Sequence, residues 1–533
     1  MDIKEDSKNS LSVEEGFQSP EPKVDDHGLH LVQRGGELGE SEIDDTSIQG
    51  FESDRMKART LLTADEEKKL LRRIDWRIMP LCSLMFLLKQ LDALNISNAR
   101  IMNEGTPRNI MTQLGLSSNA YALLTVLYYV PYIVFEAPSN LLLKKMRPSV
   151  WQARIIVSWG LCVACQVACT SKAGIYTARF FQGLCEAGMF PGVILQMCYW
   201  YRPDEMSIRL LIFYIMGNLA GVFSGLFAYA FDTVSGAQGL SGWQWLFLFE
   251  GLITIVFSGV IYWLLPDFPP TARWLSEKEK AFVQARLPPN APRASEANFK
   301  FREVLNDLKD VRLWMFTAIW ALQTVATQGI TFYQSTVIAD LGFTTIAQAQ
   351  LLNLPISILG IVLIAVSGYL ADSARLPRPV YPLTFLSVIL VCYGVLFAYP
   401  NIGGVYAATL IANAMAAAWF PLMWPWRVQT TKQATGSAFS ISFVNSYGQL
   451  GGAIGPQIFR SQYAPKYHVP FGIVMGLVAA CIMMTSATWY VTRHTEAETR
   501  RLKLARKKAD KEGMAVLDDV VDNDLQGKLK RED

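Results

Sequence analysis

Residues 178–192 read ARFFQGLCEAGMFPG, and apolar residues surround this stretch on both sides. The surroundings are typical of a segment that crosses a membrane. Yet the stretch carries two charged residues, Arg179 and Glu186. A charge at the centre of a bilayer costs roughly 2.5–3.5 kcal/mol on insertion scales, so each of these residues is expected to face a cavity or a partner.

The composition of the whole chain indicates a membrane protein. Of its 533 residues, 51% are hydrophobic and only 18% are charged, whereas soluble proteins carry about 25% charged residues. Apolar runs of about 20 residues, enough to cross a bilayer, recur between Met79 and Thr492. These runs make membrane lipids the expected surroundings. The net charge of +3 is too small to argue for a nucleic-acid partner.

Hydropathy predicts an all-α membrane protein of twelve transmembrane helices in two six-helix halves. The expected spans are 78–98, 121–143, 151–170, 174–200, 209–231, 243–265, 313–338, 348–371, 380–399, 403–426, 434–459 and 470–492. An even number of spans puts both termini on one side of the membrane. The loops on that side hold most of the Lys and Arg residues, so we expect both termini to be cytoplasmic.

The same pattern divides the chain into five parts. We expect a disordered acidic tail, an N-terminal six-helix half, a central cytoplasmic loop, a C-terminal six-helix half and a charged tail; these are residues 1–65, 66–265, 266–312, 313–492 and 493–533. Within the central loop, Ser276 followed by Glu279 predicts a capped amphipathic helix. The charged tail is expected to continue as a helix after Arg493.

Few ionisable residues lie well inside the spans, and all of them fall in the N-terminal half. They are Lys89, Asp92, Glu136, Arg179, Glu186 and Glu250. For Glu136 and Glu250 we favour a structural role, in which each pairs with a neighbouring helix. Because the C-terminal half has no such charges, anion and proton binding are expected in the N-terminal half.

Arg179 and Glu186 have a different interpretation. Seven residues at about 100° each return Glu186 to within about 20° of Arg179, roughly 10 Å along the helix axis. Gln182 falls on the same stripe. The two charges are too far apart for a simple contact pair. A cation and an acid on one wet helix face suit an anionic substrate and a coupling proton.

The C-terminal half offers only polar and aromatic groups, which would shape and select the substrate. Helix-to-helix hydrogen bonding is the alternative role for most of them. They are Gln323, Gln328, Tyr333, Gln334, Asn413, Trp419, Trp424, Asn445 and Gln449.

Motifs for catalysis are missing from the sequence. No G-x-x-x-x-G-K-[ST] loop and no H-E-x-x-H occurs. The cysteines all lie in apolar runs, where they fit as small helix residues. We therefore expect no enzyme activity, no cofactor and no metal site.

Several motifs resemble the anion:cation symporter branch of the major facilitator superfamily, and within it the fungal allantoate, nicotinate and pantothenate permease-like group. The resemblance covers about residues 66–495. It is carried by LDALNISNAR, VPYIVFEAPSN, ARFFQGLCEAGMFPG, GWQWLFLFEG and TTKQATGSAFSISFVNSYGQLGGAIGP; GYLADSAR resembles the superfamily's gating motif in the loop between spans 8 and 9.

The resemblance implies roles for particular residues. Asp92, Arg179 and Glu186 match positions associated with organic-anion and proton binding, and Asp372 and Arg375 belong to the gating motif. The family usually follows the acid of span 1 with a basic residue, whereas Ala93 stands here. Lys89 lies on nearly the same helix face as Asp92 and is our candidate replacement. The expected substrate and proton site consists of Asp92, Lys89, Arg179, Gln182, Glu186 and Asn445. Glu136, Asp372 and Arg375 are expected to be structural or gating residues.

Three functions remain open from the sequence. The first is proton-coupled symport of a small organic anion, such as a carboxylate or vitamin, by a monomer in the cell membrane. The second is export of a secondary metabolite. Exporters of this superfamily usually carry Gly-Pro in span 5, and GNLAGVFSG at 217–225 lacks that proline, which favours uptake. The third is a nutrient sensor that does not transport.

Overall fold

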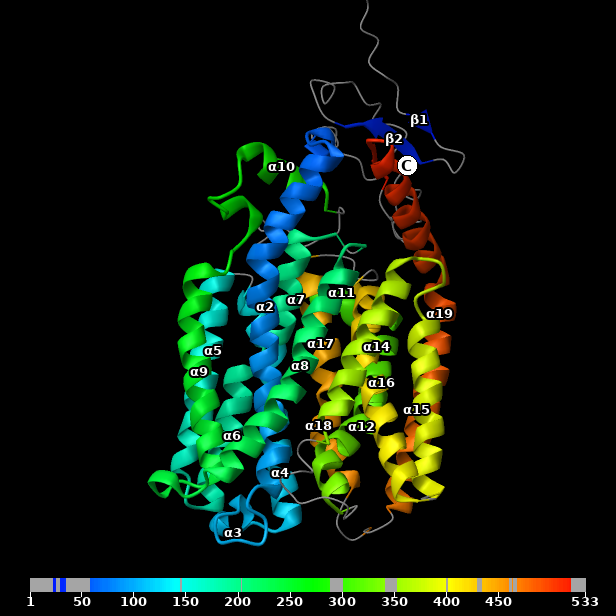
Figure 1. Ribbon diagram of the computed structural model, residues 1–533. Helices are drawn as coiled ribbons and strands as arrows, with labels where there is room; N and C mark the ends of the chain where they lie inside the picture. Colours follow the sequence, from blue (N-terminus) through cyan, green and yellow to red (C-terminus); the bar gives the residue numbers. More distant parts are fainter. Residues whose placement is uncertain are drawn as a thin grey trace, which may run out of the picture.

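The chain folds into a bundle of long helices whose loops gather at its two ends (Figure 1). The computed structural model describes residues 23–24, 29–34, 58–143, 146–202, 204–287, 301–340, 352–398, 401–428, 434–459, 463 and 467–518. The first described helix begins, and the last one ends, at the same end of the bundle. We call this end the terminal side.

The N-terminal half contains the first six spans. They are α2 (Ala64–Ile101), α4 (Ser118–Leu143), α5 (Pro148–Cys165) with the 3-10 turn η2 (Gln166–Ala168), α6 (Lys172–Glu186) followed by α7 (Met189–Trp200), α8 (Met206–Thr233) and α9 (Gly242–Leu264). The short α3 (Ile110–Leu114) and η3 (Ala237–Gly239) lie in loops. Each span falls where hydropathy predicted it.

The C-terminal half repeats this arrangement. Its spans are α12 (Val311–Asp340), α14 (Leu354–Asp372), α15 (Val380–Ala398), α16 (Ile402–Val428), α17 (Ala434–Gly448) followed by α18 (Leu450–Ile458), and α19 (His468–Lys511). Between the halves lie η4 (Pro269–Thr271), α10 (Glu277–Ala285) and α11 (Phe301–Leu308). The all-α fold with twelve helical spans is therefore confirmed.

Eight of these helices are apolar and long enough to cross a membrane by composition alone. The four remaining spans are α2, α6 with α7, α12, and α17 with α18. These four supply most of the polar residues of the central cavity described below. Their lower hydropathy therefore reflects the interior that they face rather than a position outside the bundle.

The span that carries Arg179 and Glu186 is broken, although the sequence predicted one continuous helix over 174–200. α6 ends at Glu186 and α7 begins at Met189. Gly188 between them has φ of 93°, and a Cβ there would lie 2.2 Å from the Ser139 hydroxyl oxygen. Both features require glycine. The break leaves Glu186 at the very end of α6.

A second glycine of the same stretch brings α6 against α4. A Cβ at Gly183 would lie 2.0 Å from the carbonyl oxygen of Tyr128. The two helices therefore approach each other backbone to backbone, as small residues allow in membrane bundles. This contact fixes the side of α6 that carries Arg179 relative to α4.

Part of the N-terminal tail, for which the composition predicted disorder, forms strands. β2 (His30–Gln33) pairs with β1 (Lys23–Val24) and, antiparallel, with β3 (Met514–Val516) near the C-terminus. Leu29 and Val516 are buried in one apolar cluster with Leu502 of α19. The strand forms because a distant segment completes its sheet, and local composition carries no sign of that partner.

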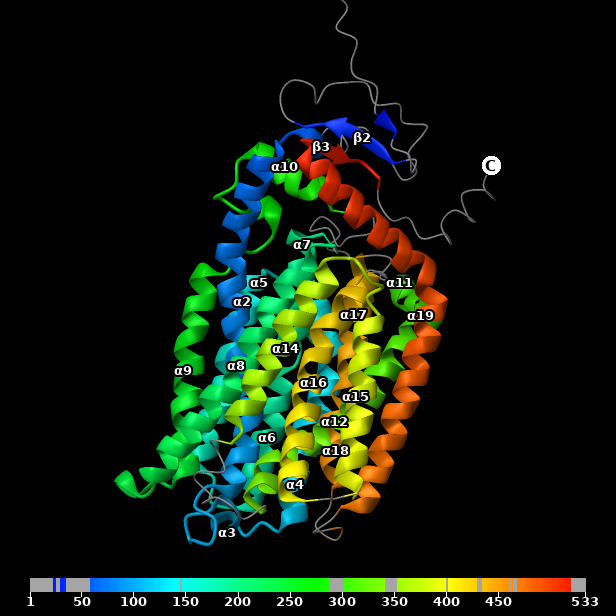
Figure 2. The same cartoon turned by 45° about the vertical axis from the view of Figure 1, so that its right-hand side comes forward.

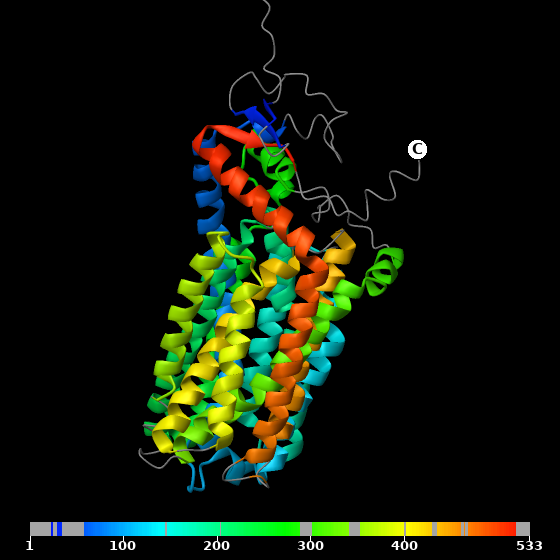
Figure 3. The same ribbon diagram turned by 90° about the vertical axis from the view of Figure 1, so that its right-hand side faces the viewer.

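Two helices outside the membrane spans agree with the sequence. α10 begins after Ser276, whose hydroxyl accepts a hydrogen bond of 3.3 Å from the Glu279 amide, and the reciprocal bond completes the predicted capping box. α19 continues past Arg493 to Lys511 without a break. It slants across the terminal side toward the small sheet (Figures 2 and 3).

Candidate functional site: a charged cavity between the halves

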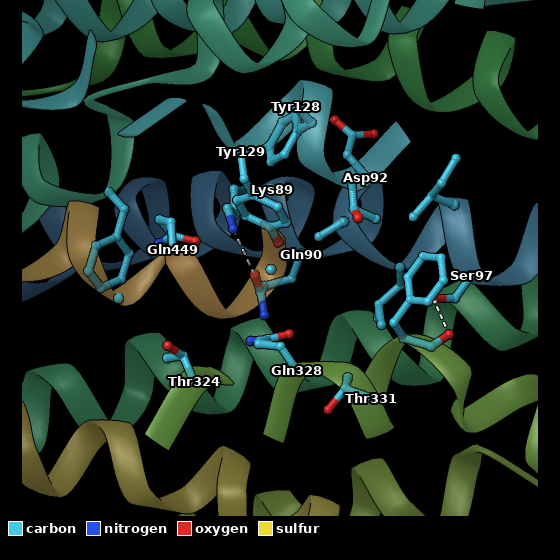
Figure 4. A pocket seen from close by; sticks show the side chains of 18 of the residues that line it. Lys89, Gln90, Asp92, Ser97, Tyr128, Tyr129, Thr324, Gln328, Thr331 and Gln449 are labelled. Atoms are coloured by element: carbon cyan, nitrogen blue, oxygen red, sulfur yellow. Dashed lines mark hydrogen bonds between the residues drawn. The ribbon is translucent and has the colours of Figure 1, made fainter. Parts of the chain in front are cut away.

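A cavity of about 210 Å³ lies between the two halves of the bundle. α2, α4 and α6 line it from the N-terminal half, and α12, α17 and α18 line it from the C-terminal half. Figure 4 shows Lys89 and Gln90 projecting toward Gln328, whereas the Asp92 carboxyl group points away from it. The cavity therefore has a charged wall on one side and a neutral polar wall on the other.

Lys89 belongs to the charged wall and is 7% exposed. Its ammonium group lies 3.4 Å from the Gln90 side-chain oxygen, which is a weak hydrogen bond at best. Among the described residues, no carboxylate comes within 4.0 Å of it. The structure thus places this predicted cation in the cavity wall without an ion-pair partner in the described part of the chain.

Arg179 is the second cation of the cavity and is 4% exposed. Its guanidinium carbon lies 5.5 Å from the centre of the Phe247 ring, and its Nε has no hydrogen-bond partner in the described part of the chain. A ring face attracts a cation weakly compared with an anion. Arg179 and Lys89 therefore both retain the capacity to bind an anion.

Of the other two residues on the predicted helix face, Gln182 and Glu186, only Gln182 lines the cavity. Gln182 lines the cavity, and its side-chain oxygen accepts a hydrogen bond of 2.9 Å from Gln166. Glu186 is buried but is not among the residues that line the cavity. It lies beside Tyr128 and Gln182, yet neither of its oxygens reaches hydrogen-bond geometry with a described residue.

Asp92 contributes to the cavity wall from α2. The indole N–H of Trp159 on α5 donates a hydrogen bond to its Oδ2. The Arg179 guanidinium is close enough to act on the same carboxyl group electrostatically. Asp92 and Lys89 of α2 and Arg179 of α6, which the sequence named from two spans, therefore line one cavity.

Asn445 joins the cavity to the contact between the halves. It lines the cavity from α17 and donates its side-chain N–H to the carboxylate of Glu136 on α4. Ser446 donates a second hydrogen bond, of 2.8 Å, to the same carboxylate. Glu136 is completely buried and lies beyond the cavity-lining residues of α4, toward the Leu143 end of that helix, which is on the terminal side. These two hydrogen bonds join the halves, and the structural or gating role expected for Glu136 stays a prediction.

On the opposite side of the cavity, other contacts join the halves. The Ser97 hydroxyl donates to the carbonyl oxygen of Phe332 at 3.0 Å. The guanidinium carbon of Arg100 lies 4.8 Å from the centre of the Tyr333 ring. Contacts between the halves therefore flank the cavity toward both ends of the bundle.

The two residues of the gating motif lie away from the cavity. Asp372, the last residue of α14, forms ion pairs with Lys503 and Lys507 of α19, the latter at 3.3 Å. Arg375 is exposed and has no ion pair among the described residues. Asp372 thus connects the end of α14 to the part of α19 that extends past Arg493. The gating role of Asp372 and Arg375 stays a prediction.

A second cavity of about 180 Å³ adjoins the first, and the two share wall residues such as Gln90 and Gln328. No residue lining it is charged. Gln334 and Asn413, expected to select the substrate, line this second cavity. Of the other residues proposed for that role, some line the first cavity and the remainder line neither; the first group is Gln328, Asn445 and Gln449, and the second is Gln323, Tyr333, Trp419 and Trp424.

Sequence reasoning missed two tyrosines that line the charged cavity, Tyr128 and Tyr129. A Cβ at Gly452 of α18 would lie 2.0 Å from the Tyr129 ring. The glycine therefore allows the ring to lie against the opposite half. The signal available in the sequence was the cluster of glycines in span 11 together with a Tyr-Tyr pair at mid-span, but it names no contact.

Comparison with known proteins agrees with the geometry. Residues 97–456 match the family model described as Major Facilitator Superfamily. The chain is 28% identical over 477 residues to the MFS-type transporter cnsO of Penicillium expansum, covering 87% of this chain and 90% of that protein. It is also 28% identical to the major facilitator-type transporter hxnP of Emericella nidulans, covering 80% of this chain and 86% of that one.

Solved structures share the fold at low sequence identity. The human organic anion transporter MFSD10 matches with a TM-score of 0.57 and 13% identity, covering 77% of this chain and 99% of that chain. A bacterial homologue of the human lysosomal transporter Spinster, in an inward-facing and unoccupied conformation, matches with a TM-score of 0.54 and 14% identity, covering 81% of this chain and 97% of that one.

Proposed function

Because the chain belongs to the Major Facilitator Superfamily, we propose that it is a secondary active transporter that takes up a small organic anion together with protons. Within the superfamily, the motifs quoted above favour the anion:cation symporter branch and its fungal allantoate, nicotinate and pantothenate permease-like group. The plasma membrane is the proposed location.

One observation supports an anionic substrate. Lys89 and Arg179 line one cavity, and neither is within 4.0 Å of a carboxylate in the described part of the chain. Burying a cation without a partner is costly. A carboxylate substrate would accept charge-assisted hydrogen bonds from both groups, and Arg179 can bind it through two parallel N–H donors. A cavity lined by two such cations therefore favours an anionic ligand.

The acids around the same cavity support the proposed proton coupling. Asp92 lines the cavity and Glu186 lies behind Tyr128, and both are buried. A buried carboxyl group beside a substrate site can take up and release a proton as its surroundings change. Symport follows if the cavity accepts the anion and the proton from the same side.

The test is uptake of labelled nicotinate, pantothenate and allantoate by permease-deficient fungal cells that express the full chain. We expect accumulation of at least one anion, driven by an inward proton gradient and abolished by a protonophore. Accumulation that persists after the gradient collapses contradicts proton coupling. If preloaded anion instead leaves the cells only when the chain is present, the protein is an exporter. If no anion moves in either direction, the result favours the sensor that does not transport. A fluorescent fusion at the C-terminus reports the membrane in which the protein resides.

A further inference from the structure

Glu250 on α9 is a buried acid for which only a structural role is expected from the sequence. It is 2% exposed and does not line either cavity. Its Oε2 accepts a hydrogen bond from Asn95, which stands three residues after Asp92 on α2. The carboxyl groups of Glu250 and Asp92 interact electrostatically, and Asp92 lines the charged cavity. Two acids from spans 1 and 6 thus meet inside the N-terminal half.

Each of these carboxyl groups has one neutral donor and one oxygen left over. Trp159 donates to Asp92 Oδ2, and Asn95 donates to Glu250 Oε2. Asp92 Oδ1 and Glu250 Oε1 are both buried and have no hydrogen-bond partner in the described part of the chain. An ionised carboxylate only accepts hydrogen bonds. Two neighbouring carboxylates with oxygens left over therefore cannot satisfy each other unless a proton lies between them.

We propose that Asp92 and Glu250 share one proton, and that this pair is a proton-binding site of the transport cycle. The proton comes from water in the cavity, forms an O–H bond with one carboxyl oxygen and is donated as a hydrogen bond to the other acid. On release it returns to water through Asp92, the member of the pair that reaches the cavity wall. The role in transport rests on the proposed proton coupling and adds Glu250 to the site.

The balance of charge supports a bound proton. Four carboxyl groups are buried in the membrane part of the N-terminal half, and the cations buried with them are Lys89 and Arg179; the four are Asp92, Glu136, Glu186 and Glu250. If all were ionised, the group would carry four negative and two positive charges, a net charge of −2. An anionic substrate would add to that excess. Uncompensated charge at this depth is unfavourable, so the acids are expected to hold protons.

The surroundings of the pair suggest how the proton and the anion are coupled. Arg179 and Glu186 are the charged groups that act on Asp92 from α6, and Asp92 itself is the charged group that acts on Glu250. An anion that binds Arg179 competes with Asp92 for the same cation. Once Arg179 is engaged, the ionised form of Asp92 loses its attraction and proton uptake by the pair is favoured. By linkage, a proton on the pair strengthens anion binding by the same factor.

The shared proton is tested on the purified full chain without substrate, by the infrared C=O stretch of protonated carboxyl groups. We expect a band that shifts in D2O and that loses intensity in Glu250→Gln and in Asp92→Asn. Glu250→Gln is a mild change, because the amide oxygen can still accept from Asn95 and the amide N–H can donate to Asp92 in place of the proton. Glu67→Gln is the matched control, because this buried carboxyl group outside the membrane spans has its pKa lowered to about 2 and is ionised at neutral pH, and it should retain the band. A band of wild-type intensity in both Glu250→Gln and Asp92→Asn overturns the proposal.

The role in transport is tested in proteoliposomes that contain a pH-sensitive dye, with nicotinate, pantothenate and allantoate as probes. Wild type should take up protons with the transported anion, whereas Glu250→Gln should still exchange the anion across the membrane but lose its accumulation against a gradient. If Glu250→Gln moves protons and anion in the wild-type ratio, the pair is not the coupling site. If wild type moves no protons with any probe while the infrared band is present, the proposed symport fails and the shared proton stands. Should Glu250→Gln not reach the membrane, Asp92→Asn carries the same test.

Discussion

Glu136 on α4 accepts a hydrogen bond of 2.8 Å from the Ser446 hydroxyl on α17, and thereby connects the two halves on the terminal side of the cavity. Asn445 donates to the same carboxylate and also lines the cavity. A transporter of two rocking halves must break such contacts to open toward that side. A ligand that draws Asn445 toward the cavity would weaken one of the two bonds.

The first prediction follows from this contact. Glu136→Leu leaves the buried donors of Asn445 and Ser446 unpaired, which costs about 1–3 kcal/mol for each unsatisfied group. We expect a lower thermal midpoint in detergent and faster access of a thiol reagent to a cysteine placed at Ser446 on the terminal side. Glu136→Gln retains an acceptor and should lose less stability. Equal stability of wild type and both variants would show that the contact does not hold the halves together.

The sequence predicted the number and positions of the spans because hydropathy depends on composition, which tertiary packing does not alter. It also placed Arg179 and Gln182 correctly on one helix face, since helical periodicity is local. It did not predict the helix break after Glu186, because the break at Gly188 depends on Ser139 of another helix. The Asp92 and Glu250 pair was missed for the same kind of reason: the two acids stand on α2 and α9, and only packing brings them together.

A second prediction concerns the glycine that joins α6 to α4. Gly183→Ala would place a methyl group 2.0 Å from the Tyr128 carbonyl oxygen, and backbone on both sides cannot easily yield. Overpacking of this kind costs about 1–3 kcal/mol. We expect a lower thermal midpoint and less protein at the membrane, measured by fluorescence-detected size exclusion.

Gly259 of α9 is the matched control for that substitution. A Cβ there meets no heavy atom within 4 Å, and the residue is helical. Gly259→Ala should be neutral, or stabilising by up to about 1 kcal/mol, because alanine is the better helix former. If both alanine variants behave alike, the close approach of α6 and α4 is not what stabilises this span.

A third prediction uses a cluster outside the membrane spans. Burial alone would raise the pKa of Glu67, but the nearby guanidinium groups of Arg286, Arg202 and Arg34 lower it from 4.5 to about 2. A carboxyl group whose pKa is depressed by folding stabilises the protein above its unfolded pKa, and this contribution is lost as the pH falls toward the folded value. Glu67→Gln should therefore lower the thermal midpoint at pH 7. The difference from wild type should shrink between about pH 4.5 and pH 2; a difference that stays constant with pH would show that the lost charge is not its cause.

A fourth prediction concerns Arg179. Arg179→Ala should abolish transport of the accepted anion while the protein remains folded and at the membrane, because a charge-assisted hydrogen bond is worth about 1.5–3 kcal/mol, or about 10- to 100-fold in affinity. Arg154→Ala is the control, since it removes an exposed guanidinium group of α5 that does not line the cavity. Binding measured by thermal shift with the transported anion should be lost in the first variant and kept in the second. Normal transport by Arg179→Ala, or its absence from the membrane, would contradict the binding role.

The last prediction asks whether Lys89 supplies the cation that Ala93 lacks. Both residues line the cavity, and they stand four positions apart on α2, so their side chains lie on one face of the helix. Lys89→Ala should weaken anion binding by about 10-fold or more, as expected for loss of one charge-assisted bond. Lys89→Ala combined with Ala93→Arg should recover part of that loss, because the new guanidinium group enters the same cavity one turn further along the helix. Lys89→Gln is the control that keeps a polar side chain without the charge, and it should resemble the alanine variant. Full affinity in either single variant would remove Lys89 from the binding site and leave Arg179 as the cation that carries the substrate.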